Sequence, residues 1–209
     1  DSKAKDEYIK PELFATKKQD KEYLTPDKEN GAAVGKISFS MDRKSPDYPA
    51  LVIANEMLGS GGFLTARIPT RLREKEGISY GAGSYVNIPI ESNVASWGWY
   101  AFYNPTKKDA VNKALKEEVN KAVKDGFTEE EYKSNLTSWL NSRKTGLGND
   151  NTLMNLVNGQ LQYGVALEEY DALEAKVSAL KVSQVNDVLR KYISEDKLTS
   201  VFAGDFNKK

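Results

Sequence analysis

The chain contains no histidine and no cysteine among its 209 residues. Without an imidazole it lacks the most common general base of hydrolases and has no histidine ligand for zinc. Without a thiol it forms no disulfide, offers no thiolate nucleophile and binds no metal through sulfur. Many hydrolytic mechanisms are therefore closed to this chain alone, and we expect any chemistry that its candidate residues serve to be carried out by another domain.

Long apolar runs and an excess of one sign of charge are missing as well. No stretch approaches the roughly 20 apolar residues of a membrane-spanning helix. The chain has 30 basic and 30 acidic residues, which gives a formal net charge of +0. We therefore expect no membrane insertion and no charge-driven binding to nucleic acid. The 39% hydrophobic and 29% charged residues are typical of a globular domain with a sizeable core.

The first 30 residues are rich in Lys, Asp and Glu, and Pro11 and Pro26 interrupt them. This composition predicts an interdomain linker, or an arm across the surface, over residues 1–30. An apolar patch in this segment could tether it: Tyr8, Ile9, Leu13 and Phe14. The chain begins at Asp1 rather than at Met, so we expect a piece of a longer protein. The folded domain is predicted over residues 31–209.

The first half of this domain has the pattern of a strand followed by two helices. Residues 33–41 alternate between apolar and polar, as a half-buried strand does. Apolar residues recur at helical spacing over residues 50–58, and the glycines from Gly59 onward end that helix. A second helix is expected over residues 63–75, where Pro69 requires a helix start, a kink or a short break.

Two long strands are expected next, over residues 78–86 and 92–103, as an antiparallel pair. The aromatic residues of the second strand divide between its two faces: Trp97, Trp99 and Tyr103 on one, Tyr100 and Phe102 on the other. A sheet with apolar residues on both faces is usually covered on both, so helices are expected on each side. The two tryptophans could stack a ligand, but packing in the core is the simpler interpretation.

The remainder is mainly helical. An apolar stripe from Val111 to Val123 predicts a helix that ends at Gly126, and Thr128 with Glu131 forms a capping box for the next helix. The later elements are expected as follows: helices over residues 149–163 and 167–180, a helix capped by Ser183, and a strand over residues 198–206. We find no internal repeat. The prediction is a single α+β domain with a mostly antiparallel sheet, covered by helices, to which the last strand returns.

Two other motifs could bind ligands but have simpler interpretations. The cluster Gly59-Ser60-Gly61-Gly62 could cradle a phosphate, yet it lacks the Gly-Lys-Ser/Thr end of a P-loop and follows no strand, which favours a tight turn. The acidic groups at residues 117–118 and 129–131 could bind Mg²⁺ or Ca²⁺ through oxygen. They lack the spacing of an EF-hand loop, and acids in a first helical turn favour the helix dipole. No metal site is predicted in this chain.

The segment from Leu72 to Tyr80 holds the candidate site. Arg73 is predicted near a helix end, and Tyr80, seven positions later, at the start of a strand. Arg73 could simply solvate the helix end, where its charge suits the dipole. Tyr80 could be a partly buried residue of the sheet. From these residues alone, a structural role and a functional role both stay open.

Three segments together resemble the M16 (pitrilysin or insulinase) metallopeptidase family: NEMLGSGG at residues 55–62, TARI at residues 65–68 and LREKEGISY at residues 72–80. Members of that family carry N-x-x-L-G-G-G, a Ser-Arg-Leu-like run and then L-R-x-K-x-G-L-x-Y. Together with residues 125–131 and 203–206, the likeness covers residues 31–206, about one family repeat. Thr65-Ala66-Arg67 departs from the usual small-Ser-Arg run, and Pro69 interrupts the helix.

The resemblance implies an α+β repeat that is used in pairs or fours to form a clamshell. The zinc site of the family, H-x-x-E-H with a later Glu, belongs to the first repeat. A chain without histidine is then similar to the C-terminal-type repeat, which binds no zinc and faces the zinc domain. In that half the family places an Arg and a Tyr near the substrate, and these map onto Arg73 and Tyr80 as substrate-binding residues. No catalytic residue is implied in this chain.

The implied chemistry is consistent with those two side chains. Attack of zinc-bound water on a peptide builds negative charge on the carbonyl oxygen. A guanidinium and a phenol can donate hydrogen bonds to that oxygen or to neighbouring carbonyls. The zinc itself is expected in the partner domain.

Three functions follow as alternatives. The first is the non-catalytic, substrate-binding half of a zinc-dependent endopeptidase. It would act on peptides with an H-x-x-E-H domain of the same precursor or of a partner subunit, and would be inactive in isolation. The second is a structural domain that only assembles with partners, because the family includes such members in respiratory complexes. The third is an unrelated α+β binding domain. Bacterial relatives of this organisation are often exported, which favours a periplasmic location.

Overall fold

The computed structural model describes residues 11–62 and 65–207 of the chain. Five strands form one sheet: β1 (Gln19–Leu24), β2 (Gly31–Ser40), β3 (Gly81–Asn87), β4 (Val94–Tyr103) and β5 (Thr199–Gly204). The longer helices are α1 (Tyr48–Asn55), α3 (Lys108–Asp125), α4 (Glu129–Gly146), α5 (Asp150–Tyr163), α6 (Glu168–Ser178) and α7 (Val182–Tyr192). The short turns are α2 (Arg67–Pro69), the π-helical η1 (Glu56–Ser60) and η2 (Thr70–Lys75), and the 3₁₀ turns η3 (Pro105–Lys107) and η4 (Glu195–Lys197). The predicted α+β class is confirmed.

The strands lie in the order β1-β5-β2-β4-β3. Every neighbouring pair is antiparallel except β1 with β5, which is parallel. The last strand therefore returns to the sheet, as the sequence predicts, and it lies between the first two strands of the chain. Ala33 of β2 shows the register, because it stands opposite Ala101 of β4 on one side and Phe202 of β5 on the other.

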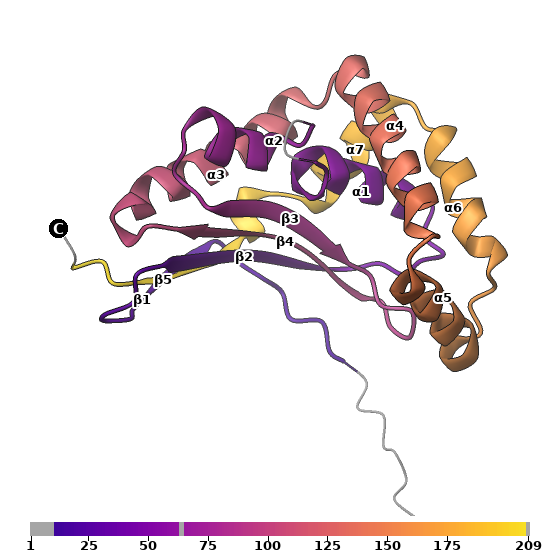
Figure 1. Ribbon diagram of the computed structural model, residues 1–209, viewed down its shortest axis with the longest axis horizontal. Helices are drawn as coiled ribbons and strands as arrows, with labels where there is room; N and C mark the ends of the chain where they lie inside the picture. Colours follow the sequence, from indigo (N-terminus) through magenta and orange to yellow (C-terminus); the bar gives the residue numbers. More distant parts are fainter. Residues whose placement is uncertain (1–10, 63–64, 208–209) are drawn as a thin grey trace, which may run out of the picture.

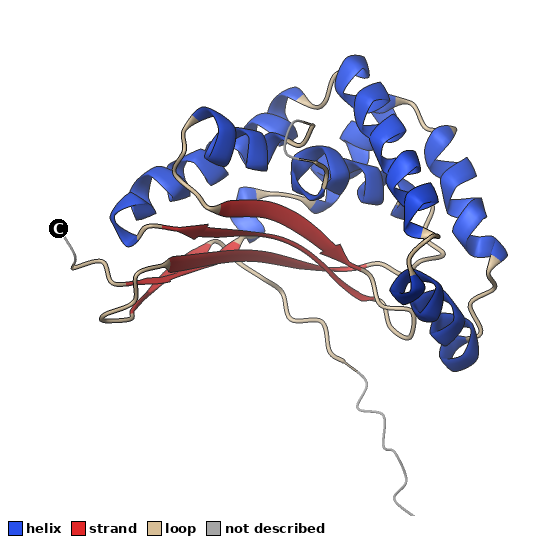
Figure 2. Ribbon diagram, viewed as in Figure 1, coloured by secondary structure: helices blue, strands red, loops and turns tan. Residues whose placement is uncertain are grey.

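The helices lie over one face of the sheet, as Figures 1 and 2 show. The core forms between this face and the helices. Trp97, Trp99 and Tyr103 of β4 are fully buried there, so the expectation that they pack in the core is confirmed. The apolar stripe of α3 faces them with Val111, Leu115, Val119 and Ala122. The side chains that strand alternation places on the inner face of β4 thus pack in one layer with those that the helical period places on one face of α3.

The opposite face of the sheet is open, which corrects the expectation of helices on both sides. No helix of the described residues covers it (Figure 2). Tyr100 and Phe102 point to this face and stay exposed, as does Val34 opposite Tyr100. The physical reason is that the apolar residues here are interrupted by lysine, serine and glycine. An antiparallel sheet can leave such a mixed face in water.

The first 30 residues contain part of the sheet, which the sequence did not indicate. The edge strand β1 lies within the stretch expected to be a linker or an arm. Its Asp20 and Glu22 pair with Lys116 and Lys108 of α3 at 2.5 and 2.6 Å. Charged residues are common on edge strands, where they oppose pairing with other chains. The charged residues within 19–24 therefore belong to a strand rather than to a linker.

The proposed tether in the N-terminal segment is not formed by the apolar side chains that the structure describes. Leu13 and Phe14 are exposed, and Tyr8 and Ile9 lie outside the described residues. Polar contacts hold the segment instead. The Ser38 amide donates to Thr16 Oγ1 at 3.1 Å, and Thr199 Oγ1 donates to the Lys17 carbonyl at 2.8 Å.

The helix boundaries follow the predicted caps in most places. Thr128 and Glu131 form the expected capping box at the start of α4. Three starts differ from the expectation. The helix expected from residue 50 begins at Tyr48. The helix expected from residue 63 begins only at Arg67 in the described part, and Pro69 lies in its first turn, where no amide donor is needed. The last helix begins at Val182 with Lys181 as its cap, not at Ser183.

Candidate functional site

Arg73 and Tyr80 lie at the two ends of one short turn. Arg73 is in η2, and Tyr80 immediately precedes β3, one residue before the strand begins. Both side chains reach solvent: that of Arg73 is 45% exposed and Tyr80 is 61% exposed. Arg73 also forms a long ion pair of 3.8 Å with Glu74. Two polar side chains that can donate hydrogen bonds are thus presented at the surface.

The backbone between these two residues is held firmly. Ile78 and Ser79 both donate their amides to the Leu72 carbonyl, at 2.9 and 3.3 Å. Leu72 is fully buried, so this carbonyl belongs to the core. Gly77 adopts a positive φ of 59°, which favours glycine at this position of the turn. The turn therefore has a defined backbone conformation.

Tyr80 is fixed to the sheet by its backbone. Its amide donates to the Phe102 carbonyl of β4 at 2.8 Å. The Ser79 hydroxyl donates to the same carbonyl at 2.8 Å and to the Gly81 carbonyl at 3.0 Å. The exposed phenol of Tyr80 is consequently carried on a backbone anchored at the edge of the open face.

Arg71 binds three carboxylates, of which Glu117 and Glu118 attach η2 to α3 and Glu76 directly follows η2. It donates to Glu76 at 2.6 Å, to Glu117 at 2.6 Å and to Glu118 at 3.0 Å. The hydrogen bond to Glu76 is the main cause that raises the pKa of Arg71 above its ordinary value. Residues two apart on a helix face different sides. Arg71 therefore orients the segment, and Arg73 is presented on another side of it.

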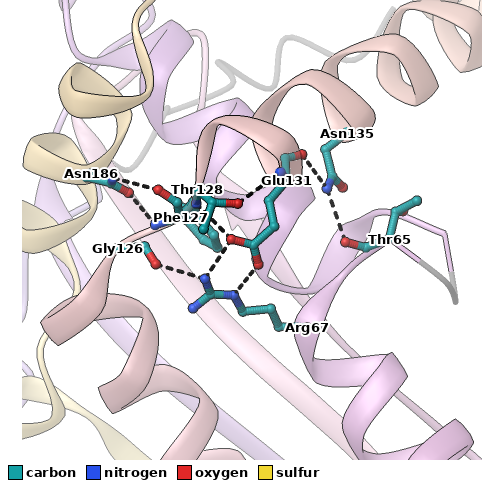
Figure 3. Close-up of polar contacts among 8 residues, drawn as sticks. All are labelled: Thr65, Arg67, Gly126, Phe127, Thr128, Glu131, Asn135 and Asn186. Carbon is teal, nitrogen blue, oxygen red and sulfur yellow. Dashed lines mark hydrogen bonds and ion pairs between the residues drawn. The ribbon is translucent and has the colours of Figure 1, made fainter.

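A second arginine fixes the start of the segment (Figure 3). Arg67 donates to both carboxylate oxygens of Glu131, at 2.7 and 2.8 Å, and to the Gly126 carbonyl at 2.8 Å. Its guanidinium lies 4.7 Å from the centre of the Phe127 ring. Asn135 of α4 donates to the Thr65 carbonyl at 3.1 Å. The beginning of α2 is therefore bound to the N-terminal half of α4.

The glycine cluster makes a close contact with β3. A Cβ on Gly59 would lie 2.5 Å from the Ser84 amide nitrogen, so only glycine lets η1 approach the strand this closely. Gly61 has a similar constraint, because a Cβ there would lie 2.7 Å from the Glu56 carbonyl oxygen. This geometry agrees with the interpretation of the cluster as a tight turn.

Asn55, the first residue of the motif at residues 55–62, is a buried hydrogen-bond acceptor. Its Oδ1 accepts from Ser84 Oγ at 2.8 Å and from Trp97 Nε1 at 3.1 Å. It joins the end of α1 to β3 and β4. Since Trp97 is fully buried and hydrogen-bonded here, it serves packing rather than ligand stacking.

Three of the acidic residues weighed as metal ligands have protein partners. Glu117 and Glu118 bind Arg71, and Glu131 binds Arg67 and caps α4. Within residues 11–62 and 65–207, no group of three or more acidic, histidine or cysteine side chains could hold a metal ion. In the same residues, no helix is both long and apolar enough to cross a membrane.

The structure adds Arg67, Arg71 and Asn55 to the residues that build the site. In the sequence, Arg67 belongs only to a departure from the motif. Local patterns do not indicate the partners of the two arginines, because Arg67 and Glu131 are 64 positions apart and Arg71 and Glu118 are 47 apart. What results is an α+β domain with a helix-covered sheet that presents a cation and a phenol on an anchored turn.

A model of the peptidase M16 inactive domain matches residues 1–137, well over half of the 209 residues. The chain therefore belongs to the M16 peptidase family, as an inactive domain. No curated protein matches the chain.

Solved structures share the fold. The chain superposes on the peptidase M16 inactive domain from Pseudomonas fluorescens with a TM-score of 0.79 and 22% identity, covering 94% of this chain and 46% of that one. A protease from Helicobacter pylori gives a TM-score of 0.79 and 19% identity, covering 97% and 48%. A chain of complex III2 from Candida albicans gives 0.70 and 15% identity, covering 91% and 47%. The chain thus spans about half the length of these relatives.

Proposed function

We propose that this chain is the substrate-binding, non-catalytic half of a zinc-dependent M16 endopeptidase. In this role Arg73 and Tyr80 donate hydrogen bonds to the carbonyl oxygens of a bound peptide. The zinc and its activated water are supplied by an H-x-x-E-H domain of the same precursor or of a partner subunit. Family membership as an inactive domain supports the division of labour between the two halves.

The observation that carries the proposal is the contrast in solvent exposure between Arg73 and Tyr80 and the residues next to them in the chain. Leu72 and Ser79 are buried, whereas Arg73 and Tyr80 reach solvent from a turn that is already held by backbone hydrogen bonds. The backbone fixes the turn, and the two side chains are presented from it. Pre-positioned donors of this kind stabilise developing negative charge without reorganising during the reaction.

The proposal predicts a loss of turnover on removing either donor. In the precursor or the reconstituted pair of domains, Arg73→Ala and Tyr80→Phe should each lower kcat by about 10²–10³-fold, as removing one oxyanion donor does in hydrolases. Lys75→Ala is the matched control for Arg73, because Lys75 is an exposed cation of the same turn η2. Tyr163→Phe is the control for Tyr80, because it removes an exposed phenol on α5.

The structural alternative makes the opposite prediction. The fold is shared with a chain of complex III2 from Candida albicans, so an assembly role has a precedent of similar architecture. If Arg73→Ala and Tyr80→Phe leave turnover unchanged while the variants stay folded, the assembly function replaces the peptidase one.

Zinc titration of the isolated chain gives an independent check. Tight binding of one zinc per chain would contradict the proposed division between the two domains.

A further inference from the structure

The open face of the sheet carries a cluster of exposed apolar side chains that the proposed hydrogen-bond donors do not use. We call it the aromatic platform, and its members are Tyr23, Val34, Tyr85, Tyr100 and Phe102. Each is between 36% and 55% exposed. They come from strands β1 to β4, and the register places Val34 opposite Tyr100. Clusters of exposed aromatic side chains mark binding surfaces more often than scattered single ones do.

Two tyrosines of the platform lie across glycines of the neighbouring strands. A Cβ on Gly83 would lie 3.0 Å from the Tyr100 hydroxyl, and a Cβ on Gly98 would lie 2.5 Å from the Tyr85 hydroxyl. The rings therefore rest against the backbone where a side chain would otherwise stand. The Tyr100 and Phe102 rings are 6.0 Å apart. Rings supported in this way present apolar area at little cost in side-chain entropy when a ligand binds.

The platform is continuous with the candidate site. The Phe102 carbonyl accepts the hydrogen bonds from the Tyr80 amide and from the Ser79 hydroxyl. Gly81, which follows Tyr80, stands opposite Phe102 in the sheet. The backbone that carries Tyr80 therefore borders the platform at Phe102.

The charge of this face indicates which peptides fit. Its strand positions include Lys21 and Lys36, and within the described strands none of them is acidic. The acidic residues of β1 alternate to the other face, where Asp20 and Glu22 pair with lysines of α3. An acidic or uncharged peptide is therefore complementary to the platform, and a basic one is not.

We propose that the aromatic platform binds an apolar or aromatic side chain of an uncharged or acidic peptide substrate, and so contributes to substrate preference. This rests on the proposed function. A second copy of the chain fits the platform less well, because five side chains are far fewer than the about 20–30 residues per partner in a stable interface. A membrane surface fits less well too, since peripheral binding relies on many basic residues.

Peptide binding to the 209-residue chain tests the proposal without the zinc domain. Two labelled acidic peptides of about ten residues, one with a central Phe and one with Ala in its place, are titrated and followed by fluorescence anisotropy. The Phe peptide should bind about tenfold or more tightly, the ratio expected when a Phe side chain is largely buried. Phe102→Ser should abolish this ratio, and Phe102→Leu should keep most of it. Leu161→Ser is the control, because Leu161 is an exposed apolar residue on α5.

Several results would overturn the proposal. Equal affinity for the two peptides, or an unchanged ratio in a folded Phe102→Ser variant, would do so. If the wild type sediments as a dimer and Phe102→Ser as a monomer, the platform binds a second copy of the chain instead. If the wild type binds vesicles of phosphatidylcholine with phosphatidylserine and Phe102→Ser does not, the platform binds a membrane instead. The two proposals fail in different measurements. The effect of Arg73→Ala and Tyr80→Phe on turnover tests the function, and the Phe-to-Ala affinity ratio tests the platform.

Discussion

Arg67 and Glu131 form a two-pronged ion pair that joins α2 to α4. The Nε and Nη2 atoms of Arg67 donate to the two carboxylate oxygens at 2.7 and 2.8 Å. Both side chains are largely shielded from solvent, at 14% and 31% exposed. Because α2 leads directly into η2, this pair sets where the segment with Arg73 begins.

Removing the guanidinium should destabilise the fold. Arg67→Ala deletes charge-assisted hydrogen bonds to Glu131 and to the Gly126 carbonyl, and we expect the free energy of unfolding to fall by about 2–3 kcal/mol. Arg67→Lys keeps the charge but loses the planar fork, so an intermediate loss is expected. Urea denaturation measures both. The control is Lys133→Ala, an exposed position on α4; a loss for Arg67→Ala no larger than that of the control would contradict the role of the pair.

The same pair predicts a pH dependence. Burial alone would raise the pKa of the Glu131 carboxyl, but hydrogen bonds from Arg67 and Thr128 hold it below the ordinary value. A carboxyl with a lowered pKa in the folded state stabilises the protein fully above its unfolded pKa of about 4.3. That stabilisation is lost as the pH falls through the folded pKa.

Comparison of the wild type with Glu131→Gln isolates this contribution. Gln can keep the capping hydrogen bond of α4 but not the charge. At about pH 7 the variant should be the less stable of the two, and the difference in unfolding free energy should shrink as the pH is lowered from about 5 toward 3. Denaturation at several pH values measures it. A difference that stays constant or grows in acid would rule out the assigned pKa direction.

Asn55 should be difficult to replace although it touches no exposed surface. Asn55→Ala leaves the Ser84 hydroxyl and the Trp97 indole without their buried acceptor. We expect a loss of about 2–4 kcal/mol, since each buried unsatisfied donor costs about 1–3 kcal/mol. Thermal and urea unfolding measure the change, with Asn158→Ala on the exposed part of α5 as the control. Equal stability of the two variants would show that these bonds contribute little.

Two glycines should respond to alanine with opposite signs. Gly59→Ala would place a Cβ 2.5 Å from the Ser84 amide nitrogen, so we expect a loss of about 1–3 kcal/mol from overpacking. Gly159 lies inside α5, and a Cβ added there would meet no atom within 4 Å. Gly159→Ala should therefore stabilise the protein by about 0.5–1 kcal/mol, because alanine is the better helix former. Differential scanning calorimetry compares them, and a Gly59→Ala variant as stable as the wild type would contradict the close contact.

Local patterns predicted much of the fold. The capping box at Thr128 and Glu131 is confirmed, because its partners are three residues apart and need no distant contact. The alternation that places Trp97 and Trp99 on the buried face is confirmed for the same reason, since successive strand residues point to opposite sides. The late start of α2 was missed because Pro69 tolerates several helix starts, and the contact that selects one joins Arg67 to Glu131.

The sequence by itself determined the periodic elements and the absence of histidine chemistry, because these depend on residue identity and short spacing. It indicated Arg73 and Tyr80 as candidate donors through the resemblance of their motif to the M16 family. The tertiary structure alone decided that one sheet face stays open, that charged residues 19–24 form its edge strand, and that the Tyr80 amide is bound to Phe102. These features arise from contacts between residues far apart in the chain. Such contacts produce no periodic pattern in the sequence, because the local sequence around each residue is the same whether or not its distant partner is present.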